Sequence, residues 1–179
     1  PLKLQVWNDE IEHAITNQGH LSHVTDKLRS LGAQWKSGCE TTNIVDDGAG
    51  TSYIEATAGV VYQLHKQAFP VFSMPTDGIY IVNDFITPYK KVTNLYAESQ
   101  DAVGDPLASS SFSYVIWGSI NGDGQTKVYL NKPYGTYAKN LPDAAVSDIS
   151  GFSDYTVPDD FQSTAFLMAR FTYILNGGV

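Results

Sequence analysis

Three histidines near the N-terminus have a spacing that could hold a metal ion. His20 and His23 lie three positions apart, and His13 precedes them on the same expected helical segment. If three copies of this helix packed around one axis, the imidazole groups of the three chains could converge on a metal ion at that axis. A metal site usually needs three or four converging ligands, however, and no carboxylate here has a matching spacing. The pattern therefore favours surface histidines with mild pH sensitivity, and we expect no bound metal.

The oxygen-bearing residues Asn121, Asp123 and Gln125 alternate as the ligands of a calcium loop do. The bidentate glutamate that closes an EF-hand loop is missing downstream. Between two apolar runs, the glycines of this segment instead predict the turn of a β-hairpin.

Residue patterns for catalysis are also incomplete. The adjacent carboxylates Asp159 and Asp160 would point to opposite faces of a strand, so they could not act together as the general acid and general base on one substrate. Cys39 and His65 have no protease signature around them, and neither a Walker motif nor GxGxxG occurs. We therefore expect a non-catalytic chain without a cofactor.

Composition restricts the partners. A chain of 179 residues with 42% hydrophobic and 17% charged residues predicts one or two folded domains with a polar surface. The net charge of −8 disfavours binding to nucleic acid or anionic lipid. No apolar run is long enough for membrane insertion. The single cysteine excludes an intrachain disulfide.

Residues 1–32 carry the only helical periodicity and predict a stalk or docking segment. The apolar positions recur at spacings of three and four residues, and Gly32 is a suitable stop. About two heptads are too short for a free-standing coiled coil, so this stripe must dock on its own β domain or on sister chains. The predicted oligomer seam consists of Leu21, Val24, Leu28 and Leu31.

Residues 33–179 predict a mainly β domain, because short runs of Val, Ile, Tyr, Phe and Thr alternate with turn formers. Such intervals are typical of a β-sandwich or a barrel-like fold. A polar segment, 97–111, marks a possible seam between two β units. The strands predicted are Ser52 to Ala56, Val60 to Leu64, Ile79 to Asn83, Lys91 to Leu95, Phe112 to Ile120, Lys127 to Asn131 and Ala165 to Leu175, with turns at 46–50 and 121–124.

Aromatic residues gather in the turn-rich segment 133–164. Tyrosines and phenylalanines among Gly, Ser, Asn and Asp are typical of paratope-like or carbohydrate-binding surfaces. The same residues could instead pin a long loop to the β core. The candidate ligand-binding residues are Tyr134, Tyr137, Phe152 and Tyr155.

The stretch from Ser109 to Tyr173 resembles modules of bacteriophage tail fibres and related virion appendages, and the segment from Thr51 to Asn83 is similar to the β-rich repeats of such fibres. The resemblance is carried by Phe112-Ser113-Tyr114-Val115-Ile116-Trp117-Gly118, by Val128-Tyr129-Leu130-Asn131-Lys132-Pro133-Tyr134-Gly135-Thr136-Tyr137, by Tyr155-Thr156-Val157-Pro158 and by Ala165-Phe166-Leu167-Met168-Ala169-Arg170. It implies an intertwined homotrimer on a short helical stalk, located on the virion or outside the cell. It supplies no functional residues.

These observations lead to the hypothesis of a structural or receptor-binding appendage protein that attaches to a host surface through several copies. Three weak sites on one axis raise avidity by a factor of about 100 to 10,000. The expected partners are sister chains, other virion proteins and a cell-surface glycan. The alternatives are a purely architectural virion protein (capsid fibre, decoration or connector subunit) and a monomeric carbohydrate-binding module.

Overall fold

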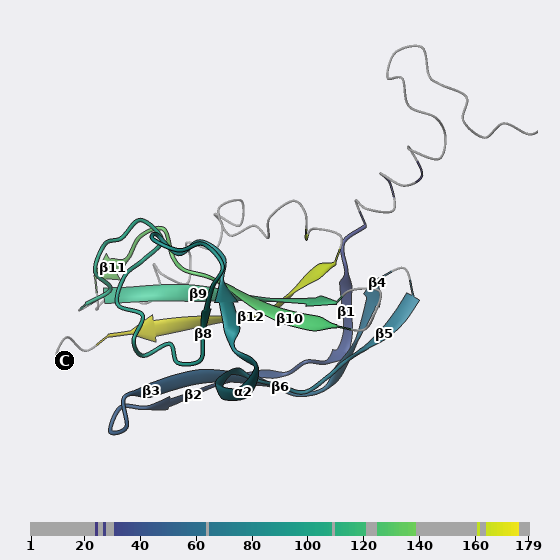
Figure 1. Ribbon diagram of the computed structural model, residues 1–179, viewed down its shortest axis with the longest axis horizontal. Coiled ribbons are helices and arrows are strands. Elements are labelled where there is room, and N and C mark those ends of the chain that lie inside the picture. Colours follow the sequence, from purple (N-terminus) through teal and green to yellow (C-terminus); the bar gives the residue numbers. More distant parts are fainter. Residues whose placement is uncertain are drawn as a thin grey trace, which may run out of the picture.

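The computed structural model describes residues 31–63, 65–108, 110–120, 125–138 and 164–175, together with Val24, Lys27 and Phe161. These residues form a mainly β fold of three sheets, none of which closes on itself. The largest sheet lies across the other two, and Figure 1 shows this layered arrangement. The sandwich-like prediction therefore fits, whereas a closed barrel does not describe the chain.

The largest sheet is built around the long strand β9. Strand β12 pairs with one edge of β9 along most of its length, while β10 and then β11 pair with the other edge. Beyond β10 the order continues through β7, which is parallel to β10, to β8. The bounds are β7 Ile79–Ile81, β8 Lys90–Val92, β9 Ser110–Ile120, β10 Thr126–Asn131, β11 Tyr137–Ala138 and β12 Ala165–Ile174.

Two three-stranded sheets form the opposing layer, in the orders β1-β4-β5 and β2-β3-β6. The β2–β3 turn is fixed locally, because Asp46 accepts a hydrogen bond from the N–H of Ala49 and Gly50 adopts a φ of 63°. The bounds are β1 Gln34–Gly38, β2 Thr41–Asp46, β3 Thr51–Ala56, β4 Gly59–Gln63, β5 His65–Phe69, β6 Phe72–Ser73 and the single-turn helix α2 Met74–Asp77.

One hydrophobic core joins the layers. The rings of Phe112, Tyr114 and Tyr173 lie 5.1 to 5.5 Å apart on the inner face of β9 and β12. Phe69 of β5 meets Phe166 of β12 edge to face at 5.4 Å, which ties the small sheets to the large one. The alternation of apolar residues along β9 explains why these side chains share one face.

The structure confirms all seven predicted strands to within three residues at each end, and the predicted turn at 46–50 joins β2 to β3. Strands β9 and β10 pair antiparallel, as the second predicted turn requires, but residues 121–124 themselves lie outside the described part. The structure adds β1, β2, β5, β6 and β11, which the pattern did not predict. Most of the expected helical segment lies outside the described residues. Within the described part, no helix is long and apolar enough to cross a membrane.

Candidate binding surface

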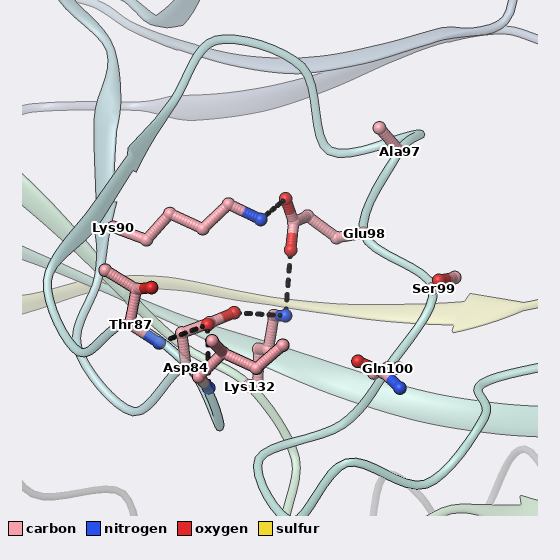
Figure 2. Close-up of a pocket in the computed structure, with 9 residues that line it drawn as sticks. Asp84, Thr87, Lys90, Ala97, Glu98, Ser99, Gln100 and Lys132 are labelled. Atoms are coloured by element: carbon pink, nitrogen blue, oxygen red, sulfur yellow. Dashed lines mark hydrogen bonds and ion pairs between the residues drawn. The ribbon is translucent and has the colours of Figure 1, made fainter.

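A buried chain of ion pairs lies where β10 ends against two loops. Lys132 follows β10, and its side chain is only 3% exposed. Its Nζ lies 2.9 Å from Asp84 Oδ2 and 2.8 Å from Glu98 Oε2. Lys90 Nζ lies 2.7 Å from the other oxygen of Glu98, so two ammonium groups and two carboxylates neutralise one another (Figure 2).

The local sequence around Asn83 and Asp84 builds one half of this arrangement. Asp84 Oδ1 accepts hydrogen bonds from the N–H groups of Ile86 and Thr87, which is the behaviour of aspartate at the start of a turn. Asn83 Oδ1 accepts from the N–H of Lys132 at 2.8 Å, and its Nδ2 donates to the carbonyl of Lys132 at 2.9 Å. The loop after β7 is therefore fastened to the end of β10 by both backbone and side-chain bonds.

Electrostatics hold these groups in their charged forms. Burial alone would raise the pKa of Asp84, but the hydrogen bonds from Lys132, Thr87 and Ile86 and the charge of Lys132 lower it to about 2. Burial likewise opposes the charge of Lys132, yet the hydrogen bonds and charges of Glu98 and Asp84 raise its pKa. Neither group exchanges a proton near neutral pH, so the arrangement suits anchoring rather than acid and base chemistry.

A pocket of about 190 Å³ lies above these ion pairs. Its walls come from the loop after β7 and from residues 97–100, and Figure 2 shows Thr87, Ser99 and Gln100 around the charged groups. The two lysines and two carboxylates of the ion pairs neutralise one another, so the floor of the pocket has no net charge. The groups at its rim are neutral hydrogen-bonding groups.

The anchored loops carry large apolar side chains outward. Phe85 and Ile86 are 61% and 76% exposed, immediately after Asp84. Phe85 packs beside Gly104, next to the exposed Val103. The N–H of Ala102 donates to the carbonyl of Pro133, which brings the exposed Tyr134 to the same end. Phe85, Ile86, Val103 and Tyr134 are called the loop-end surface below.

The structure describes two of the four predicted ligand-binding residues, and one of them lies on this surface. Tyr134 belongs to it, and Tyr137 lies in β11 opposite Ser111. Phe152 and Tyr155 lie outside the described residues, so their part in a site stays a prediction.

The same holds for most of the N-terminal residues singled out above. His13, His20 and His23 and the seam residues Leu21 and Leu28 lie outside the described part, while Val24 and Leu31 are exposed. In the part that the structure describes, no group of His, Cys, Asp and Glu converges as metal ligands would.

Lys132, Asp84 and Glu98 were not predicted from the sequence. They are separated by up to 48 residues, and no motif marks them. The only local signal was the Asn-Asp pair after a strand, which is a common turn sequence.

Comparison with known proteins gives no further identification. No family model, curated protein or solved structure matches this chain. The resemblance to tail-fibre modules thus receives no support from these comparisons and stays a proposal.

Proposed function

We propose that this chain is a non-catalytic attachment domain of a tail fibre or similar virion appendage, and that its loop-end surface contacts a glycan on a host cell. The observation that carries the proposal is the exposure of Phe85 and Ile86 on a loop anchored from below by buried ion pairs. Contiguous exposed apolar side chains commonly mark interaction sites. Anchoring reduces the entropy that the loop loses on binding.

The charged groups support binding over catalysis. With the pKa of Asp84 at about 2 and that of Lys132 raised, both remain ionised through the physiological range. These two charged groups thus position the loop, and the apolar side chains of Phe85 and Ile86 contact the glycan.

The predicted homotrimer is supported by two residues of the predicted seam. Val24 and Leu31 are 54% and 49% exposed in the single chain. The stripe had two possible partners, its own β domain or sister chains, and the exposure of these two side chains favours sister chains. Three chains would place three loop-end surfaces on one axis, and weak sites would then add up through avidity.

Light scattering coupled to size exclusion tests the oligomer. A mass near three times 19.6 kDa is expected, and Val24→Ser with Leu31→Ser should lower it toward 19.6 kDa. A single-chain mass for the unmodified protein would remove the stalk argument and favour the monomeric carbohydrate-binding module.

Attachment is tested on an array of immobilised neutral and acidic glycans. The double variant Phe85→Ser, Ile86→Ser should lose most of the signal while keeping its thermal midpoint, because both side chains are exposed. Val71→Ser is the matched control, since Val71 is 68% exposed in the connection between β5 and β6. Equal signals from all three proteins would refute the role of the loop-end surface.

A further inference from the structure

The outer face of the large sheet carries a row of aromatic and basic side chains. Cross-strand register places Lys91 of β8 opposite Tyr80 of β7, Tyr80 opposite Tyr129 of β10, and Tyr129 opposite Trp117 of β9. Directly opposed residues of neighbouring strands point to the same face. Lys127 also lies on this face, because it precedes Tyr129 by two positions in β10.

Two lysines converge on one tyrosine in this row. Lys91 Nζ lies 5.8 Å and Lys127 Nζ lies 5.7 Å from the centre of the Tyr80 ring. Both lysines are exposed, and in the described part of the chain neither forms an ion pair with a carboxylate. Attraction to the ring holds each ammonium group beside Tyr80.

The backbone favours this placement of Lys91. Gly78 immediately precedes β7, has a φ of 71° and leaves room for the aliphatic stem of Lys91, which a Cβ at this position would meet. The stem is thereby laid against the sheet beside Tyr80.

Charge selects the kind of ligand. The chain as a whole carries −8, so a polyanion such as nucleic acid would be repelled by most of the surface. A molecule with a single negative group is repelled far less, and it gains the attraction of the two ammonium groups, which no carboxylate of the described residues neutralises.

The neighbouring side chains suit a sugar attached to that negative group. Tyr129 and Ser119 hydrogen-bond to each other, and Trp117 Nε1 donates to Asn131 Oδ1 at 2.8 Å, so this part of the row is fixed. Tyr129 itself is buried, whereas Tyr80 and Trp117 are partly exposed. Each of these two rings offers a flat apolar body with a polar edge, to which the alternating C–H and hydroxyl groups of a saccharide are complementary.

We propose that Lys91, Tyr80 and Lys127 form a binding site for an acidic saccharide, in which the two ammonium groups attract its carboxylate and its ring lies along Tyr80. This inference rests on the proposed glycan attachment and names the class of sugar. The site lies on the outer sheet face rather than on the loop-end surface, so the two can be tested separately.

The test is a titration of the isotope-labelled full chain with sodium glucuronate, followed by NMR. Shifts are expected at the backbone amides of Tyr80, Lys91 and Lys127, and glucose at the same concentration should leave them unchanged. The double variant Lys91→Gln, Lys127→Gln should weaken glucuronate binding about tenfold. Raising the salt to 0.5 M should weaken it in the unmodified protein, because the charges are exposed.

Lys36→Gln is the matched control. Lys36 Nζ lies 5.9 Å from the Tyr62 ring, which has one lysine rather than two, and this variant should bind glucuronate normally. Equal shifts with sodium sulfate would show that charge alone is recognised and would overturn the saccharide assignment. An unchanged spectrum with glucuronate would overturn the site. Neither result would affect the glycan-array signal that depends on Phe85 and Ile86, so the attachment proposal would stand or fall by its own assay.

Discussion

Replacing Lys132 by methionine should destabilise the protein strongly at neutral pH. Lys132 is the shared partner of Asp84 and Glu98, and its side chain is 3% exposed, so water cannot substitute for the lost ammonium group. The variant keeps the length of the side chain but leaves the two carboxylates facing each other. Breaking a buried ion pair from one side typically costs about 3 to 5 kcal/mol.

The pKa of Asp84 gives a second estimate of this cost. Lowering it from the ordinary 3.8 to about 2 corresponds to about 2 kcal/mol of stability at neutral pH for one partner alone. Because the folded-state pKa is lowered, this stability is present above about pH 4 and is lost as the pH falls toward 2. Glu98 adds a second buried carboxylate, which brings the total toward the 3 to 5 kcal/mol range.

Equilibrium unfolding in urea measures the difference between the two proteins. In Lys132→Met the buried Asp84 carboxylate loses its ammonium partner, so its pKa should rise, protonation should stabilise the variant, and the difference should shrink as the pH falls from 7 to 4. Lys66→Met, at an exposed position of β5, is the control and should change stability by less than about 0.5 kcal/mol. A loss below about 1 kcal/mol for Lys132→Met, or a difference independent of pH, would refute the anchoring role.

Two further predictions concern buried titratable groups. Burial raises the pKa of Tyr173 to about 12, so folding stability should fall as the pH rises from 10 through 12, and Tyr173→Phe should show a shallower decline in the free energy of unfolding. A decline of unchanged slope would contradict this assignment. Burial also raises the pKa of the Cys39 thiol, so a disulfide reagent at pH 8 should modify the native protein far more slowly than the urea-unfolded chain; equal rates would contradict its burial.

The fold could be predicted where a strand carries its own signal. Residues 112–120 are strongly β-forming, and the glycines of 121–124 separate them from 127–131, so the β9–β10 hairpin followed from local physics. Strand β1, Gln34–Gly38, is almost wholly exposed and has no apolar alternation. Its pairing with β4 depends on tertiary structure, which the local sequence pattern does not predict.

The candidate site was less predictable, because its charged groups meet only after folding. Lys132 stands between a strand and a proline in the sequence, where a lysine is ordinarily solvated. Its burial depends on Asp84 and Glu98 arriving from loops 34 to 48 positions away. Tyr134 could be singled out because aromatic residues in a turn-rich segment already suggest a contact surface.

The pairing of β12 with β9 determines how the domain would bear mechanical force. β12 begins beside β1 and runs toward the opposite end of the molecule, as Figure 1 shows. Tension applied between Gly32 and Leu175 is therefore directed along the strand. The nine cross-strand residue pairs of β12 and β9 are then loaded in shear and must yield together, instead of opening one after another from an end. A domain with this connectivity can transmit a pull between its two ends without unfolding strand by strand.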